Sequence, residues 1–292
     1  MNNATNQTSK FVSWEDAVAW LISQPDRQEL VQQCYFDRPV RDAVERYGSS
    51  EEWVAIKEFL PSAAGRVLDI GAGNGLVSVA LAKAGWKVTA LEPDPSQFVG
   101  AGAIRNIASE DNLPIKVVEQ FGESMPFDDS EFDLVIARQV VHHAHDLDQM
   151  MAEVSRVLTP GGRFIMLRDH LVDSEDDLVR FRDEHPLHNL YGGENAFRLS
   201  EYKAALARAG LGIQHELHQF DSVINYAPKT KADLCGVVTT KIRPTWLRPF
   251  MDRLLASEPL FSLVTKTASK FYRKPGRLVT FICDKSKVAS AS

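Results

Sequence analysis

The feature that most constrains this chain is the run VLDIGAGNG at residues 67–75, in which three glycines follow a short apolar segment. Glycines at 71, 73 and 75 allow the backbone to turn sharply and to approach a ligand closely. The helix expected to follow, at residues 76–84, would present its N-terminal amide groups at this turn. The run therefore predicts a ligand site outside the carboxyl ends of parallel strands.

Short apolar segments alternate with segments of helical spacing from residue 66 onward. We expect strands at 66–70, 87–91, 115–119, 132–137, 163–167, 213–220 and 277–283, and helices at 76–84, 95–109, 147–158 and 200–209. Strands that alternate with helices of this length indicate βαβ units. The sequence therefore predicts an α/β fold with a doubly wound, mostly parallel, seven-stranded sheet.

Four regions are expected along the chain. Residues 1–60 have apolar residues at helical spacing and are expected to form an N-terminal helical lid. Residues 61–222 would form the α/β core, and residues 223–276 a basic amphipathic helical insertion. Residues 277–292 would supply the last strand and a C-terminal tail. A hydrophobic fraction of 44% is sufficient to build one such core.

Two classes of cofactor bind at turns of this kind, and the local residues separate them. The dinucleotide fingerprint has its third glycine five residues after the first, where this chain has Leu76. Asp69 lies inside the first strand, and its carboxylate suits a cationic, amine-bearing ligand better than a pyrophosphate. Glu92, at the end of the second strand, could bind both hydroxyls of a ribose. These residues disfavour a nicotinamide-dependent oxidoreductase.

At these positions the chain resembles the class I S-adenosylmethionine-dependent methyltransferases, particularly the branch of ubiquinone and menaquinone biosynthesis. Three later segments extend the resemblance: ESMPFDDSEFDLV at 123–135, RQVVHHAHD at 138–146 and EVSRVLTPGGRFIM at 153–166. The resemblance covers about residues 60–220. It implies S-adenosyl-L-methionine as cofactor and methyl transfer as the activity.

The resemblance also implies which residues bind the cofactor. They are Asp69, Gly71, Ala72, Gly73, Glu92, Pro93, Phe121, Gly122, Glu123, Arg138 and Gln139. Asp69 and the glycine turn would hold the methionine portion, and Glu92 the ribose. Arg138 and Gln139, just after the fourth strand, would line the methionine end.

One position departs from the family pattern. Relatives often have an aspartate before the residue that matches Gly122, where it binds the adenine amine, whereas this chain has Phe121. Phe121 is therefore expected to stack on the adenine, with Glu123 or backbone groups binding the amine.

Histidines gather near the expected ligand side of the sheet. Transfer to a hydroxyl requires a base, and our candidates are His143 and His170, with Asp169 as an orienting partner. One imidazole of the His142–His143 pair could instead satisfy backbone groups of its turn, and the polar segment 185–194 could pack on itself. The imidazoles of His170 and of the segment 185–194, with nearby carboxylates, could supply a general base or a metal site. No compact ligand spacing such as HExxH is present, so no metal site is predicted.

Residues 241–274 carry eight cationic and two anionic side chains, a net charge of +6 in a chain whose total is −6. Aromatic and apolar residues recur there at helical spacing. This pattern is typical of helices that lie on an anionic membrane surface. The alternative is a helical lid that packs on the core and keeps its lysines in water.

Composition excludes several other classes. The net charge of −6 argues against nucleic-acid binding. Three scattered cysteines (Cys34, Cys235 and Cys283) fit neither a disulfide framework nor a zinc cluster. No apolar stretch is long enough to span a bilayer, so we expect a cytoplasmic protein, with peripheral membrane contact as the alternative.

The expected reaction is O-methylation of a small-molecule, glycan-type or lipid-linked acceptor. The remaining alternative is a catalytically silent protein that binds the cofactor as a scaffold or regulator. No feature indicates the oligomeric state.

Overall fold

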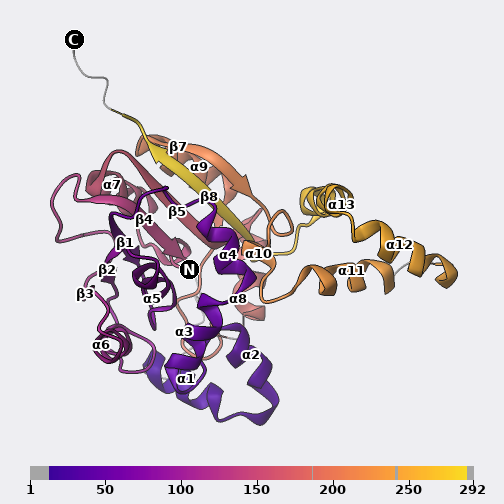
Figure 1. Cartoon of the computed structure of the whole chain (residues 1–292), viewed down its shortest axis with the longest axis horizontal. Coiled ribbons are helices and arrows are strands. Elements are labelled where there is room, and N and C mark those ends of the chain that lie inside the picture. The colour runs from indigo at the N-terminus through magenta and orange to yellow at the C-terminus, as the bar shows by residue number, and fades with distance from the viewer. Residues whose placement is uncertain (1–12, 186, 241–242, 288–292) are drawn as a thin grey trace, which may run out of the picture.

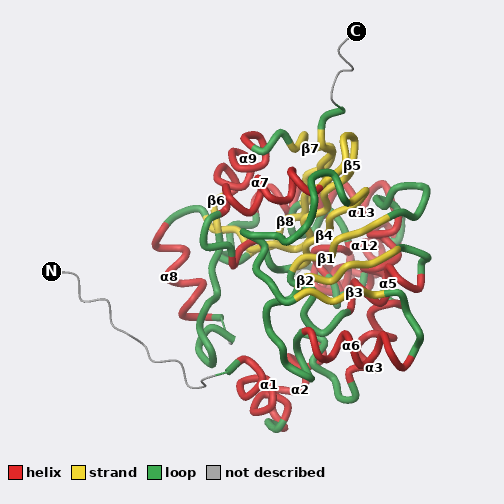
Figure 2. The backbone as a smooth tube through the Cα atoms, turned by 90° about the vertical axis from the view of Figure 1, so that its left-hand side faces the viewer, coloured by secondary structure: helices red, strands yellow, loops and turns green. Residues whose placement is uncertain are grey.

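The computed structural model describes residues 13–185, 187–240 and 243–287. Within these residues, a single twisted sheet has the strand order β3-β2-β1-β4-β5-β8-β7, and a short β6 pairs with β5 (Figure 2). The strands are β1 (Arg66–Ile70), β2 (Lys87–Leu91), β3 (Ile115–Val118), β4 (Phe132–Arg138), β5 (Leu158–Val172), β6 (Phe197–Arg198), β7 (Leu211–Leu217) and β8 (Arg277–Lys285).

The sheet is mostly parallel. β1 pairs in parallel with β2 on one side and with β4 on the other, so the chain reverses its direction of winding at β1. Only β8 is antiparallel to its neighbours, β5 and β7. The predicted fold is therefore confirmed, and the two-residue β6 is an addition too short to leave a recognisable pattern.

Helices cover both faces of the sheet. One core lies beneath α7 and α9, and the other beneath α3, α4 and α5. The helices are α1 (Trp14–Ile22), α2 (Gln28–Gln33), α3 (Val40–Gly48), α4 (Glu51–Lys57), α5 (Leu76–Lys83), α6 (Ala101–Glu110), α7 (Leu147–Val157), α8 (Glu175–Glu184), α9 (Leu199–Arg208), α10 (Val223–Tyr226), α11 (Lys231–Thr240), α12 (Arg248–Leu255) and α13 (Glu258–Phe271), with 3-10 turns η1 (Pro25–Arg27), η2 (Val141–His143) and η3 (Thr245–Leu247).

Several boundaries differ from the prediction. β5 begins at Leu158 rather than 163, because the TPGG segment continues the strand through an irregular register instead of forming a separate turn. α6 begins at Ala101 rather than 95, since Asp94 and Ser96 accept backbone amide hydrogen bonds in a preceding loop. β7 ends at Leu217 rather than 220. Side-chain capping and strand irregularity of this kind are weakly encoded in apolar periodicity.

The helical insertion extends away from the sheet. Figure 1 shows α11, α12 and α13 projecting as an arm from the body of the protein. Among the described residues, no helix combines the length and apolarity needed to cross a bilayer.

A buried ion pair joins the N-terminal helices to the sheet. Glu52 of α4 accepts hydrogen bonds from Arg138 at the end of β4, with Nε–Oε1 2.7 Å and Nη2–Oε2 3.0 Å. Arg168 of β5 lies 3.8 Å from the same carboxylate. Burial alone would raise the pKa of Glu52, but Arg138 and Arg168 hold it below its ordinary value.

Glu52→Ala is expected to destabilise the protein by about 3–5 kcal/mol, because it leaves buried guanidinium groups without their carboxylate. Urea unfolding followed by circular dichroism measures the change. Asp148→Ala is the matched control, because it breaks an exposed ion pair with Arg208 and should cost at most about 1 kcal/mol. Equal effects of the two substitutions would contradict the stabilising role of the buried Glu52 ion pair.

Candidate active site

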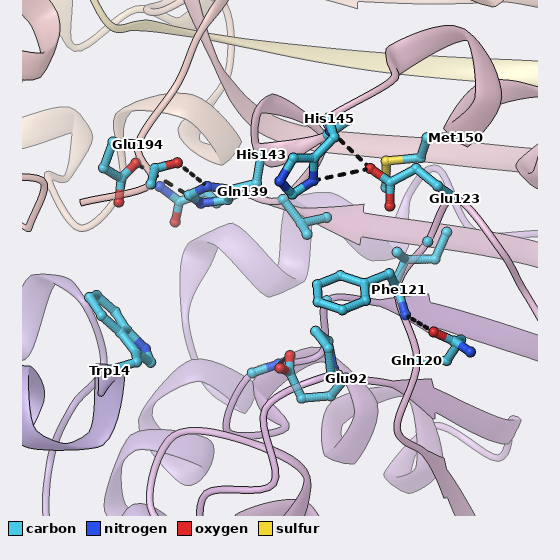
Figure 3. Close-up of a pocket in the computed structure, with 18 of the residues that line it drawn as sticks. Trp14, Glu92, Gln120, Phe121, Glu123, Gln139, His143, His145, Met150 and Glu194 are labelled. Atoms are coloured by element: carbon cyan, nitrogen blue, oxygen red, sulfur yellow. Dashed lines mark hydrogen bonds and ion pairs between the residues drawn. The ribbon is translucent and has the colours of Figure 1, made fainter. Parts of the chain in front are cut away.

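A cavity of about 540 Å³ lies at the carboxyl ends of the parallel strands (Figure 3). Its volume suits a small-molecule ligand. Of the residues predicted to bind the cofactor, those that line it are Gly71, Gly73, Glu92, Pro93, Phe121, Gly122, Glu123 and Gln139. Trp14 of α1 lines it as well, so the N-terminal region contributes to its wall.

The glycine turn is held by backbone contacts on both sides. The amide groups of Gly71 and Ala72 donate to the carbonyl oxygen of Leu91, at 2.8 and 3.2 Å, and so fix the turn against β2. Gly71 has φ +61°, and a Cβ atom there would lie 2.2 Å from Val140 Cγ2. Only glycine can occupy this position without displacing Val140.

Glu92 lies where the turn meets the cavity. Its Oε2 accepts a hydrogen bond from the Gly73 amide at 2.7 Å, and its Oε1 one from the Asp94 amide at 2.9 Å. Burial is the main cause that raises the pKa of Glu92 to about 7. Each carboxylate oxygen keeps a further lone pair, so this group can still accept hydroxyl hydrogen bonds from a ligand.

Asp69 lies beneath the turn and does not itself line the cavity. Its Oδ2 accepts a hydrogen bond from Ser78 Oγ at 2.6 Å, whereas its Oδ1 is buried without a hydrogen-bond partner among the described residues. Burial is again the main cause that raises the pKa of Asp69, to about 7. An unpartnered buried carboxylate oxygen favours a cationic ligand at this turn.

Arg138 differs from its predicted place. It does not line the cavity but forms the ion pair with Glu52, and its Nη1 donates to Gln139 Oε1 at 3.0 Å. Gln139, which does line the cavity, has φ +55°. Arg138 therefore positions Gln139 instead of contacting the ligand, a distinction that adjacent residues at a strand end do not reveal.

Phe121 has the exposed ring that the prediction requires. Its side chain is 57% exposed and borders the cavity beside Glu123, as Figure 3 shows. Glu123 Oε1 accepts a hydrogen bond from the His145 amide at 2.9 Å. An aromatic face and a carboxylate are therefore available at the adenine end of the expected ligand.

Asp169 orients a different histidine from those predicted. Its Oδ1 lies 2.8 Å from His142 Nδ1 and also accepts the His142 backbone amide at 2.9 Å. Burial would lower the pKa of His142, but hydrogen bonds to Asp169 and Glu194 raise it to about 9. His142 is therefore a buried cation at neutral pH, and the sequence could not tell which of two adjacent imidazoles turns inward.

His143 faces the cavity, in agreement with its candidacy as a base. Its Nδ1 lies 3.0 Å from the carbonyl oxygen of Gly193, which can only accept, so Nδ1 carries the proton and Nε2 is the free acceptor. Burial and the neighbouring His142 lower the pKa of His143.

His170 is not on the cavity, contrary to its candidacy as a base. Its Nδ1 lies 2.9 Å from the carbonyl oxygen of Gly276, and its ring packs on Phe181. Burial lowers its pKa well below the ordinary value.

Glu194 is the functional candidate that sequence reasoning missed. Its carboxylate lies 3.5 Å from His142 Nε2, 4.0 Å from His143 Nε2 and 3.8 Å from His185 Nδ1. Burial would raise its pKa, but these histidines lower it to about 2. The signal was its place at the end of the segment HPLHNLYGGE, which no generic part of the fold requires.

Comparison with known proteins agrees with this geometry. Residues 68–166, which include the glycine turn and Glu92, match the family model described as a methyltransferase domain. The chain carries a class I methyltransferase domain. The predictions of that family and of S-adenosyl-L-methionine as its cofactor are thereby confirmed.

The relatives differ in what they methylate. The chain is 32% identical to a sterol 4-C-methyltransferase of Caenorhabditis elegans, over 47% of this chain and 42% of the relative. It is 34% identical to the 27-O-demethylrifamycin SV methyltransferase of Amycolatopsis mediterranei, over 52% of this chain and 56% of the relative. The chain thus spans about half the length of these relatives.

A solved structure supports the fold over a longer range. Geranyl diphosphate C-methyltransferase from Streptomyces coelicolor superposes with a TM-score of 0.54 at 16% identity, over 80% of this chain and 78% of that one. At this identity the likeness establishes the fold alone.

Affinity for S-adenosylmethionine is expected to fall as the pH is lowered from about 8 to about 6. A cationic ligand favours the ionised forms of Asp69 and Glu92, whose pKa values are about 7, so binding releases protons. Across this range the affinity should fall about tenfold for each linked carboxyl, because the ionised fraction of a group with a pKa of about 7 falls by that factor. Calorimetric titration across this range measures it.

Two controls accompany the titration. S-adenosylhomocysteine, which keeps the ammonium group and the ribose, should show a similar pH dependence, and Glu92→Gln should reduce the dependence for both ligands. An affinity for S-adenosylmethionine that is independent of pH would contradict the role of the buried carboxylates.

Proposed function

We propose that this protein methylates a hydroxyl group of a small-molecule acceptor. The observation that supports it most is His143, whose unprotonated Nε2 borders the same cavity as the glycine turn and Glu92. S-adenosylmethionine supplies an electrophilic methyl group when bound. The protein's part is to hold the acceptor oxygen in line with that group and to remove its proton.

The cavity residues fit the cofactor. The Asp69 carboxylate, buried beneath the turn with Oδ1 unpartnered among the described residues, would attract the ammonium group from behind the turn, and the Glu92 carboxylate would accept hydrogen bonds from the ribose hydroxyls. The exposed ring of Phe121 offers a stacking face for the adenine, with Glu123 beside it. Gln139, held by Arg138, would contact the methionine end.

The acceptor would enter on the side of His143. Tyr191, Gly192 and Gly193 form the cavity wall there, together with Trp14 from α1. Gly193 also fixes the tautomer of His143, so the same segment shapes the acceptor site and directs the base. The Tyr191 hydroxyl and the backbone groups of this wall support an acceptor that bears a hydroxyl group, such as a phenolic or glycan-type compound.

The names of relatives support a small acceptor without choosing one. One relative is named for O-methylation of a rifamycin and another for C-methylation of a sterol. A silent scaffold or a nicotinamide-dependent oxidoreductase is not favoured, since the carboxylates at the turn suit a sulfonium ligand and His143 supplies a base.

His143→Ala is expected to lower turnover by about 100-fold to 10,000-fold while leaving affinity for S-adenosylmethionine nearly unchanged, because general bases contribute on this scale. Turnover is measured as S-adenosylhomocysteine formed with a panel of nucleotide sugars and phenols, and NMR identifies the methylated atom. The matched control is His215→Ala, an exposed histidine of β7 that does not line the cavity. A product methylated on carbon or nitrogen, or full turnover by His143→Ala, would contradict the proposal.

We also propose that the projecting arm contacts anionic lipid. Trp246, Phe250 and Phe271 are 75%, 60% and 80% exposed, in the segment that carries the excess of positive charge. The alternative of a lid packed on the core is less consistent with these exposures and with the projection of α11 to α13 in Figure 1. Exposed aromatic groups among cations favour the interface of an anionic bilayer.

The full chain should therefore sediment with vesicles that contain phosphatidylglycerol and much less with vesicles of phosphatidylcholine alone. Replacing both Lys266 and Lys270 by Gln should weaken binding about thirtyfold, since each cation contributes about 1 kcal/mol. The matched control replaces Lys57 and Lys87, exposed on the body, by Gln. Equal binding to anionic and to neutral vesicles, or an equal loss of vesicle binding in the two double variants, would refute the contact.

A further inference from the structure

We propose that His170, His185 and Glu194 form a binding site for one divalent transition-metal ion, with zinc as the best-fitting ion. The site lies behind the cavity wall formed by Tyr191, Gly192 and Gly193. It does not depend on the proposed methyl transfer. Of the two predicted bases, His170 lies away from the cavity, and the metal site gives it a role.

The three side chains converge from separate parts of the chain. His170 belongs to β5, His185 follows α8, and Glu194 precedes β6. One ligand atom from each lies within 4.8 Å of the other two, and His185 Nδ1 lies 3.8 Å from Glu194 Oε1. Ligands at about 2 Å from zinc stand about 3–3.5 Å apart, so a small contraction would close the site.

The imidazole of His170 is oriented as in a metal ligand. Its Nδ1 donates to the carbonyl oxygen of Gly276 at 2.9 Å, which leaves Nε2 unprotonated. A second nitrogen fixed by a backbone carbonyl is the usual outer contact of a metal-bound histidine.

The carboxylate of Glu194 is also positioned by neighbours that would not bind the ion themselves. Its Oε2 faces His142 Nε2 at 3.5 Å, and the other nitrogen of His142 is bonded to Asp169. Oε1 is the oxygen that faces His185. An outer set of His142 and Asp169 therefore leaves one oxygen of Glu194 for an ion.

His185 has a buried nitrogen that the packing of these polar side chains on one another does not satisfy. Its Nδ1 is buried and has no hydrogen-bond partner among the described residues. An imidazole nitrogen buried without a partner is costly unless another group satisfies it. A metal ion between His185 and Glu194 would satisfy it directly.

The donor set indicates the kind of ion. Two imidazoles with one carboxylate suit zinc and other late transition metals, whereas magnesium and calcium prefer oxygen ligands. When bound, the ion would fix Glu194, and with it the adjoining wall residues Tyr191, Gly192 and Gly193, to β5 and to Gly276.

The test measures metal directly in the full-length protein. After dialysis against a chelator and titration with zinc, elemental analysis should find one ion per chain in the unsubstituted protein. His185→Ala and His170→Gln should each weaken zinc affinity by at least about tenfold. Cobalt is a second probe, because its visible absorption reports imidazole coordination, and the spectrum should disappear in the same variants.

Two matched variants sharpen the result. His188→Ala changes a neighbouring histidine outside the cluster and should retain the ion, as should His143→Ala, which would lose it only if the ion sat between His142 and His143. Circular dichroism checks that each variant is folded. Absence of stoichiometric zinc in the unsubstituted protein, or its retention by folded His185→Ala, would overturn the proposal.

Calorimetric binding of S-adenosylmethionine by the same samples separates this inference from the proposed function. Loss of zinc with retained cofactor binding supports the metal site whatever the acceptor proves to be. Failure to bind zinc in a protein that binds the cofactor rejects the metal site alone.

Discussion

Asp69 and Glu92 hold two carboxyl groups out of water at the ends of β1 and β2, and neither forms an ion pair within the described residues. Desolvation raises the pKa of both to about 7, so near neutral pH each carboxyl is divided between its neutral and ionised forms. A cationic ligand relieves this cost, whereas an anionic pyrophosphate would increase it. The choice of cofactor class thus follows from the burial of these two groups.

The rest of the site depends on fixing the backbone around them. Gly71 packs against Val140 so closely that no side chain fits, and Val140 precedes the turn that carries His142 and His143. Arg138, two residues before Val140, is anchored by Glu52 from the N-terminal helices. Loss of the Glu52–Arg138 ion pair would therefore affect Gln139 directly, and His142 and His143 through the few residues between them.

The sequence was sufficient for the fold and for most of the cavity, because the glycine run and the alternation of strands and helices are local signals. It was insufficient where the answer depends on which way a side chain turns. In two pairs of adjacent residues, one side chain turns to the cavity and the other away from it: Arg138 with Gln139, and His142 with His143. Glu52 and Asp169, from distant parts of the chain, bind the member of each pair that turns away. Glu194 reaches the site from an irregular segment, for which apolar periodicity predicts nothing.

The most direct test of the central claim is calorimetric titration of the full chain with S-adenosylmethionine and with NAD, repeated for Asp69→Ala. The account predicts binding of S-adenosylmethionine that weakens about tenfold to a hundredfold in the variant, as expected for loss of a buried charged hydrogen bond, and no binding of NAD. Binding of NAD, or undiminished binding of S-adenosylmethionine by folded Asp69→Ala, would contradict it.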